Sequence, residues 1–255
     1  MDKVIEVRNL SLTYHSLQGE TLALDDISFD VYKGEFISII GPSGCGKTTI
    51  LSLLSGLLKP SKGTVLVNKV IPNPKNAQAG YMFQRDNLLS WRNIEKNILF
   101  GLEIQGRKTK ENCAKALNLL DKYGLKDFRK KRPDELSGGM RQRVALIRTL
   151  ALNPSILLLD EPFSALDYQT RLNVCDDVAN IIKQEKKTAI LVTHDLQEAI
   201  SMSNRIIVLT SRPAKIKKIY TLTFDKNLTP FEKRNLPEAE VLFNQLWGEI
   251  QNEQK

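Results

Sequence analysis

The chain has 255 residues and a formal net charge of +8 at pH 7. It is long enough to bury a hydrophobic core without disulfide or metal staples. Hydrophobic residues make up 42% and charged residues 26%, which excludes a chain that is disordered or collagen-like throughout. A membrane-spanning helix needs about 20 consecutive apolar residues, and no such run is present, so we expect no transmembrane segment.

The net charge leaves several kinds of partner open, whereas the cysteine content argues against two kinds of protein. The basic excess leaves open nucleic acid, an anionic membrane surface, a phosphate ligand, or no such partner. Cys45, Cys113 and Cys175 form no CxxC pair, which argues against a disulfide framework and a structural zinc site and fits a reducing compartment. The N-terminus has no apolar signal-peptide core, so we expect the protein not to be secreted.

The first sixty residues predict strands followed by one helix. Val4–Leu10 partly alternates between apolar and polar residues, and Ile27–Val31 alternates again, which is typical of half-exposed antiparallel strands. Glu35–Ile40 is a mostly apolar run that ends at a glycine, which indicates a buried parallel strand. Thr48–Leu58 has the length of a helix and stops just before Pro60.

The middle of the chain changes in character. Short strands are predicted at Thr64–Val67 and Tyr81–Phe83. Between about residues 86 and 152 the strand signals vanish, and helical spacing dominates, as in Asn112–Tyr123. We therefore expect a helical insertion inside an α/β domain.

Strands and helices alternate again after the insertion. The predicted elements are a strand at Ile156–Leu159, a helix at Gln169–Glu185, a strand at Thr188–Val192, a short helix closing at Ala199–Met202, and strands at Arg205–Leu209 and Ile216–Leu222. This order favours a mixed α/β fold with buried parallel strands.

The tail from Pro237 predicts an amphipathic helix that packs on the domain. Its apolar residues are Val241, Leu242, Leu246 and Ile250. We expect one domain over residues 1–230 and a helical extension over residues 231–255.

Gly41–Thr48 (GPSGCGKT) matches the pattern GxxxxGK[ST] between a predicted strand and a predicted helix. The glycines let successive backbone N–H groups surround one anion, and the helix start faces the same phosphates. Lys47 supplies a positive charge for the β- and γ-phosphates, and Thr48 a hydroxyl for Mg²⁺. Cys45 is read as a small filler, the alternative being a reactive thiol at a helix N-terminus. The alternative is a glycine-rich turn that matches the pattern by chance. The predicted strand before the segment and the predicted helix after it favour the phosphate-binding interpretation.

A buried strand also delivers two carboxylates at its carboxyl end, in ILLLDE at Ile156–Glu161. Asp160 can hold Mg²⁺ directly or through water. Glu161 can face the γ-phosphate as the general base for a water molecule. Many buried strands end in a solvated acid, but the phosphate-binding pattern upstream favours the functional interpretation.

A second predicted anion site lies in LSGGMRQR, which we call the signature segment (Leu136–Arg143). Ser137 is a good helix N-cap, and Gly138 and Gly139 permit close backbone approach. The segment therefore presents another helix N-terminus to an anion. A plain capped helix start is the alternative.

The signature segment resembles the signature motif of the ATP-binding cassette (ABC) family, and the resemblance extends over nearly the whole chain. Tyr14 resembles the aromatic residue that stacks on adenine. Gln84 resembles the glutamine that senses Mg²⁺ and the attacking water, and His194 the histidine that contacts the γ-phosphate. Ser164–Asp167 resembles the segment that crosses the dimer interface after the catalytic glutamate.

The resemblance implies a P-loop NTPase fold of the ABC type, with an antiparallel β subdomain and an inserted helical subdomain. It implies ATP and Mg²⁺ as cofactors, and a homodimer in which each ATP lies between Gly41–Thr48 of one chain and Ser137–Gly139 of the other. The expected catalytic residues are Glu161, His194 and Gln84. The expected metal ligands are Thr48, Gln84 and Asp160. The expected cofactor-binding residues are Tyr14, Gly41, Pro42, Ser43, Gly44, Cys45, Gly46, Lys47, Thr48, Thr49, Ser137, Gly138, Gly139, Gln142 and Asp167.

Three classes of ABC protein remain to be separated. Repair-type members carry a long coiled coil, but only about ninety residues without heptads separate Lys47 from Ser137. Translation-type members carry two copies of each motif, and this chain carries one. A membrane importer subunit fits. Asn87–Asn93 (NLLSWRN) and Ser211–Ala214 (SRPA) resemble segments of nitrate, sulfonate and taurine importer ATPases. A branch for thiamine-precursor pyrimidines or aromatic acids shares these segments, so the solute stays open.

An importer subunit also needs partners. We expect no nucleic acid, but permease subunits that contact residues 86–100, a solute-binding protein reached indirectly, and a peripheral place on the cytoplasmic face of the membrane. Leu88, Leu89 and Trp91 are the candidate permease contacts, because interfaces favour Trp and Arg anchors. The alternative is that these three side chains form the core of the insertion.

Overall fold

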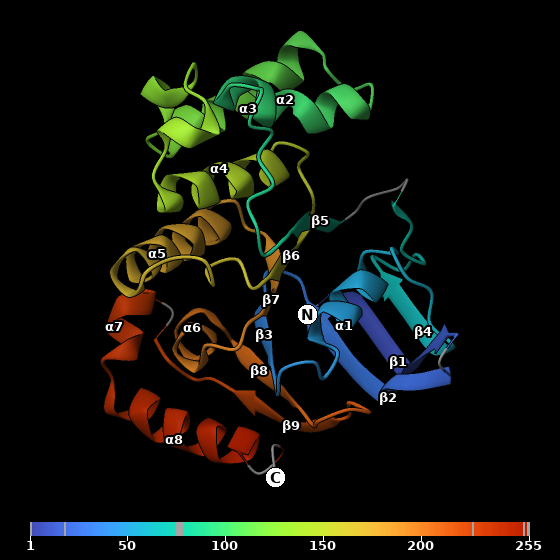
Figure 1. Cartoon of the computed structure of the whole chain (residues 1–255). Helices are drawn as coiled ribbons and strands as arrows, with labels where there is room; N and C mark the ends of the chain where they lie inside the picture. Colours follow the sequence, from blue (N-terminus) through green and yellow to red (C-terminus); the bar gives the residue numbers. More distant parts are fainter. Residues whose placement is uncertain (1, 18, 75–78, 226, 252, 254–255) are drawn as a thin grey trace.

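Two β-sheets form the frame of the molecule (Figure 1). The structure is a computed structural model that describes residues 2–17, 19–74, 79–225, 227–251 and 253. One sheet has the antiparallel order β2-β1-β4. The other has the order β5-β6-β7-β3-β8-β9, in which only β9 is antiparallel to its neighbour.

The strands are β1 (Lys3–Ser16), β2 (Gly19–Tyr32), β3 (Phe36–Ile40), β4 (Lys62–Val67), β5 (Ala79–Met82), β6 (Ile156–Asp160), β7 (Thr188–Val192), β8 (Arg205–Leu209) and β9 (Ile216–Thr221). The α-helices are α1 (Lys47–Leu54), α2 (Ile94–Ile104), α3 (Lys110–Lys122), α4 (Gly138–Leu150), α5 (Tyr168–Gln184), α6 (Leu196–Met202), α7 (Pro230–Arg234) and α8 (Pro237–Gln251). Two 3₁₀ turns, η2 (Lys126–Phe128) and η3 (Pro133–Glu135), precede α4.

The strands β3, β6 and β7 are buried along their whole length. Because side chains alternate across a strand, each strand contributes to two cores. In β6, Ile156 and Leu158 join the core shared with α1 and the antiparallel sheet. Leu157 and Leu159 join the core shared with α4 and α5. The near-continuous apolar runs in the sequence are thus explained by helices and strands covering both faces of the sheet.

The predicted helical insertion is confirmed. Between β5 and β6 the described chain forms only α2, α3, α4 and the two 3₁₀ turns, and in Figure 1 α4 lies between the six-stranded sheet and the more distant α2 and α3. A separate apolar core holds these helices together, with Ile98 of α2, Leu120 of α3 and Ile147 of α4 fully buried. The antiparallel sheet near the N-terminus is confirmed as well.

The C-terminal helix α8 packs beside α6 and β8, as Figure 1 shows. Leu246 is fully buried in the core that these elements share, and Leu242 and Ile250 pack against it. The prediction for Val241 was wrong, because this side chain is 58% exposed. At 100° per residue Val241 lies far round the helix from Leu246, and Ala239 takes the buried position instead.

The first helix is shorter than predicted. α1 ends at Leu54 and not at Leu58, because Gly56 adopts φ +76° just after the helix. A left-handed glycine at this place is a common helix stop. A Cβ on Gly56 would lie 2.6 Å from the carbonyl oxygen of Pro72, so no other residue fits there. Within the described residues, no helix has the length and apolarity needed to cross a bilayer.

Candidate active site

A pocket of about 590 Å³ lies where the carboxyl ends of β3, β6 and β7 meet the start of α1. Its lining residues are Gly41, Pro42, Ser43, Gly44, Gly46, Lys47, Thr48, Thr49, Glu161, His194, Leu196, Arg212, Trp247 and Ile250. Ligands of open parallel sheets bind at this edge. We call this cavity the phosphate pocket, and Gly41–Thr48 the phosphate loop.

The phosphate loop has the curved backbone that its glycines predict. Gly44 and Gly46 have φ values of +73° and +115°, a region that favours glycine. The Lys47 side chain is buried, and its Nζ atom donates hydrogen bonds of 2.9 Å to the carbonyl oxygens of Gly41 and Pro42. The ammonium group therefore lies within the curve of the loop, where an anion would be surrounded by backbone N–H groups.

Cys45 is a buried filler of this loop, as the first interpretation predicted. Burial raises the pKa of its thiol despite the nearby Lys47 ammonium. A thiol that stays protonated is a poor nucleophile, so the structure disfavours the alternative of a reactive cysteine.

Asp160 ends β6 and faces the loop. Its Oδ1 atom accepts a 3.0 Å hydrogen bond from the Thr48 hydroxyl, and its Oδ2 atom accepts one of 3.0 Å from the Tyr81 hydroxyl. Burial raises the pKa of Asp160 against the opposing effect of these hydrogen bonds. The two predicted metal ligands Thr48 and Asp160 are thus in direct contact.

Glu161 follows Asp160 in a sharp turn with φ +44°. The left-handed region costs a non-glycine residue about 1–2 kcal/mol. The Glu161 N–H donates to the carbonyl of Val192, and its Oε2 atom lies 3.1 Å from Nδ1 of His194. The turn therefore directs the carboxylate into the phosphate pocket, next to the predicted histidine.

Gln84 is linked to Glu161 through one side chain. Its Nε2 atom donates a 3.3 Å hydrogen bond to Oγ of Ser164, and that hydroxyl donates to the backbone carbonyl of Glu161 at 3.0 Å. Gln84 is exposed and does not line the phosphate pocket. No described contact joins it to Thr48 or Asp160, its predicted partners at the metal.

Asp167 and Tyr14 also lie outside the set of residues that line the phosphate pocket. Asp167 is the N-cap of α5, where it accepts a hydrogen bond from the N–H of Thr170, and this bond holds the pKa of Asp167 below its ordinary value. The Tyr14 hydroxyl lies 3.1 Å from the hydroxyl of Thr49, which does line the pocket. Tyr14 thus stands at its edge, with an exposed ring.

The signature segment caps α4 as predicted: Oγ of Ser137 accepts a 3.3 Å hydrogen bond from the N–H of Met140. Ser137, Gly138 and Gly139 do not line the phosphate pocket of their own chain. Gln142 is 3% exposed, so its side chain offers almost no surface to a ligand, and its Oε1 atom is buried without a partner. The two predicted anion sites are therefore separate within one chain.

Several residues that line the pocket or hold one of the site residues were not among the predicted site residues. Tyr81 carries no motif, yet it holds Asp160 from the neighbouring strand β5. Leu196, Arg212, Trp247 and Ile250 complete the pocket wall from three separate segments. The sequence analysis named Arg212 as part of Ser211–Ala214, which resembles importer ATPases, and Ile250 as an apolar residue of the C-terminal helix. Neither observation predicted that the residue lies at the site.

The candidate permease contacts divide into two kinds. Leu88 is partly buried and packs on the core of the insertion, whereas the Trp91 side chain is 72% exposed. The alternative that all three side chains are core is therefore wrong for Trp91. A large exposed aromatic side chain is a feature of binding surfaces.

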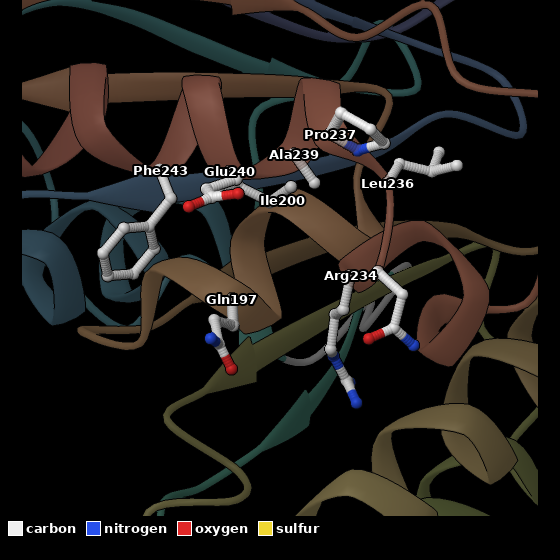
Figure 2. Close-up of a pocket in the computed structure, with 9 residues that line it drawn as sticks. Gln197, Ile200, Arg234, Leu236, Pro237, Ala239, Glu240 and Phe243 are labelled. Carbon is white, nitrogen blue, oxygen red and sulfur yellow. The ribbon is translucent and has the colours of Figure 1, made fainter.

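A second cavity, of about 410 Å³, lies between α6, α7 and the start of α8 (Figure 2). Gln197 and Ile200 line it from α6, and Arg234 and Phe243 from the two C-terminal helices. It contains none of the predicted site residues.

Comparisons with known proteins agree with this site. Residues 24–164 match the family described as ABC transporter. The chain is 49% identical to an uncharacterized ABC transporter ATP-binding protein, YtlC of Bacillus subtilis, over 98% of this chain and 97% of that protein. It is 41% identical to the taurine import ATP-binding protein TauB of Jannaschia sp., over 86% of this chain and 82% of that protein. The dimeric post-hydrolysis structure of the ATP-binding cassette MJ0796, bound to ADP and Pi, has a TM-score of 0.72 and 29% identity, covering 87% of this chain and all of that one.

The class of protein follows from the fold and the site together: an α/β P-loop NTPase with an inserted helical subdomain. The chain belongs to the ABC transporter family and is an ATPase of that family.

Proposed function

We propose that the chain is the ATP-hydrolysing subunit of a membrane importer for a small solute of the nitrate, sulfonate or taurine type. One observation carries the ATPase mechanism: a single pocket brings together residues of the phosphate loop and the Glu161–His194 pair, with Asp160 bonded to Thr48 in its wall, while Ser137–Gly139 lie outside it. The solute class rests on the similarity to a taurine import protein. A pyrimidine or aromatic-acid importer is the alternative.

The triphosphate binds to the phosphate loop. Lys47 gives up its two carbonyl partners at Gly41 and Pro42 and neutralises the β- and γ-phosphates, while the backbone N–H groups of the loop hold their oxygens. Tyr14, fixed at the pocket edge by its contact with Thr49, stacks on the adenine ring.

The Thr48–Asp160 pair fits Mg²⁺, which prefers oxygen ligands and keeps several waters. Among the described residues no three His, Cys, Asp or Glu side chains gather to hold a metal ion, so the protein supplies only part of the coordination and the phosphates supply more. When bound, the ion neutralises charge on the phosphates. Asp160 holds the Thr48 hydroxyl in place. Gln84 is linked through Ser164 to the backbone carbonyl of the neighbouring Glu161.

Glu161 is the general base. Its carboxylate accepts a proton from water as the water oxygen attacks the γ-phosphorus and the bond to ADP breaks. His194, 3.1 Å from that carboxylate, orients it and contacts the γ-phosphate. The strained backbone at Glu161 fixes the carboxylate before the substrate binds, so little reorganisation is needed.

A second copy of the chain completes the site. Each ATP lies between the phosphate loop of one protomer and Ser137–Gly139 of the other, because one chain keeps these two sites apart. The capped N-terminus of α4 then offers its N–H groups to the γ-phosphate. Hydrolysis removes this bridge and opens the dimer, which is the motion passed to the permease.

Residues 86–100 form the permease contact, with Trp91 as the exposed anchor. The subunit then lies at the cytoplasmic face of the membrane, and a solute-binding protein meets it only through the permease. The domain division after residue 230 belongs to this proposal: the ATPase unit precedes it, and the rest of α7, which begins at Pro230, and all of α8 follow.

The test is the variant Glu161→Gln, which keeps the shape of the side chain but cannot accept the proton. We expect ATP binding to persist, turnover to fall by about 1,000-fold or more, and a dimer to accumulate with ATP on a sizing column. The measurements are phosphate release, and elution volume with ATP and with ADP. Turnover at the normal rate would remove Glu161 from the role of base.

The matched control is Lys47→Ala, which removes the ammonium group from the phosphate loop. Nucleotide binding itself should weaken, so this variant should elute as a monomer with ATP. A dimer with Lys47→Ala would separate dimerisation from nucleotide binding and contradict the proposal.

A further inference from the structure

The loop between β8 and β9 contacts the phosphate loop through one side chain. Arg212 donates a hydrogen bond from Nη2 to the carbonyl oxygen of Gly44 at 2.6 Å, across 168 residues of sequence. Both residues line the phosphate pocket. Arg212 is therefore a second cation at this pocket besides Lys47, and the mechanism above does not use it.

Its bond fixes the orientation of one peptide unit in the phosphate loop. A peptide unit is planar and trans, so its carbonyl oxygen and its N–H point in opposite directions. Arg212 holds the oxygen of the Gly44–Cys45 unit on one side, and the Cys45 N–H therefore points to the other, where it lies 3.3 Å from the carbonyl of Pro42. Gly44 has no side chain to hold this peptide and stands at φ +73°, so the Arg212 contact adds a second restraint to the bond between Cys45 and Pro42.

The same loop is bonded to Glu253, which lies just beyond the end of α8 at Gln251. Ser211, next to Arg212, donates its N–H to Oε2 of Glu253 at 3.1 Å. Lys217 on β9 pairs with Glu249 at 3.1 Å and with Glu253 at 2.9 Å. The segment that carries Arg212 is thus tied to Glu253, just beyond α8, and the following strand is tied through Lys217 to Glu253 and to Glu249 of α8.

α8 itself reaches the phosphate pocket. Trp247 and Ile250 line the pocket, although they stand more than fifty residues beyond His194. Trp247 stacks on Phe243 with ring centroids 6.2 Å apart and planes at 8°, which fixes the direction of its indole. The Trp247 side chain is nevertheless 51% exposed, so it has apolar surface left for a ligand to cover.

We propose that α8 is a wall of the nucleotide pocket and that Arg212 is a positioning residue that joins this wall to the phosphate loop. Bound nucleotide covers the free surface of Trp247, and Arg212 holds the Gly44 peptide ready for the phosphates. This inference deepens the proposed ATP site and rests on it.

The first test uses the full chain with Trp91→Phe, which leaves Trp247 as the sole tryptophan. Saturating Mg-ADP should lower the acrylamide quenching of Trp247 by about half, because ligand pockets bury most of a ligand's surface and the walls lose the same exposure. Calorimetry on the same sample measures binding independently. If calorimetry detects binding but the quenching of Trp247 does not change, the proposal that α8 forms a wall of the nucleotide pocket is wrong. If calorimetry detects no binding, the proposed nucleotide site is wrong, and this inference fails with it.

The second test measures the Mg-ADP affinity of Arg212→Met and Arg212→Lys by calorimetry. We expect Arg212→Met to bind about 3–10-fold more weakly, the low range for losing a charged hydrogen bond at an exposed position. Arg212→Lys keeps a charged donor and should recover part of the loss. The matched control is Arg107→Met, an exposed arginine of the helical insertion whose side chain bonds Gln105. Equal affinity of Arg212→Met and this control overturns the role of Arg212.

Discussion

Glu198 is a carboxylic acid buried on α6, four residues after the predicted catalytic histidine. It is 4% exposed, and its Oε2 atom accepts a 2.6 Å hydrogen bond from the Thr193 hydroxyl. Burial raises its pKa from 4.5 to about 7. The charged and titratable groups around it are Asp195, Arg171, Arg234 and Cys175. The folded chain therefore binds this proton more tightly than the unfolded chain does.

This shift in pKa predicts a loss of stability with rising pH. The contribution of Glu198 is fully present below pH 4.5 and is lost as pH rises to about 7. Glu198→Gln keeps an acceptor for Thr193 but does not ionise. Its free energy of unfolding relative to wild type should rise by about 1–2 kcal/mol between about pH 5.5 and about pH 8. Urea denaturation over this pH range measures the difference. Exposed Glu238→Gln is the control, and a parallel pH profile for the two variants would contradict the prediction.

Elements whose signal is local were predictable from the sequence. The strands at Thr188–Val192 and Arg205–Leu209 have their predicted bounds, because a short apolar run covered on both faces is visible in the residues themselves. Asp160 and Glu161 were predictable as neighbours of the phosphate loop, since parallel strands deliver their ends to one edge.

Contacts between distant segments had no such signal. Arg212 meets Gly44 only because β8 lies beside β3 in the folded sheet, and strand order is not written in either strand. Likewise the tail of the chain predicts an amphipathic helix, but not that the side of α8 carrying Trp247 lines the phosphate pocket. The sequence therefore predicted the loops that carry the candidate catalytic residues, but not the residues from distant segments, such as Arg212 and Trp247, that line the pocket beside them.

The start of α4 offers a way to separate capping from nucleotide contact. Asp is as good an N-cap as Ser, so Ser137→Asp should leave the free energy of unfolding within about 0.5 kcal/mol of wild type. The added carboxylate would face the triphosphate across the dimer and should lower ATP turnover by about 10-fold or more. Urea denaturation and phosphate release are the two measurements. Ser137→Ala is the converse control, expected to cost about 1 kcal/mol of stability. Normal ATP turnover in Ser137→Asp would contradict the proposed nucleotide contact of Ser137 and would mean that this residue serves only as a helix cap.

At the scale of the whole molecule, the nucleotide site and the candidate permease surface occupy different parts of the fold. The phosphate pocket lies at the edge of the six-stranded sheet, and Trp91 precedes α2 in the insertion. Asp86, near the start of the insertion, pairs with Arg141 of the signature segment at 3.1 Å. Arg148, farther along α4, donates to the carbonyls of Asp86 and Asn87. If the proposed dimer closure moves α4, these bonds would carry that movement to the segment that leads to Trp91.

This arrangement predicts that Trp91→Ala uncouples the subunit from its permease. Because the Trp91 side chain is 72% exposed and does not line the phosphate pocket, nucleotide binding should be unchanged. Loss of one buried aromatic anchor costs about 2 kcal/mol or more at an interface, so transport in vesicles should fall by about 30-fold. The control is Phe231→Ala, an aromatic residue on α7 that is 53% exposed and outside residues 86–100. Transport at the full rate with Trp91→Ala would mean that the permease binds elsewhere, and loss of nucleotide binding would mean that Trp91 supports the fold.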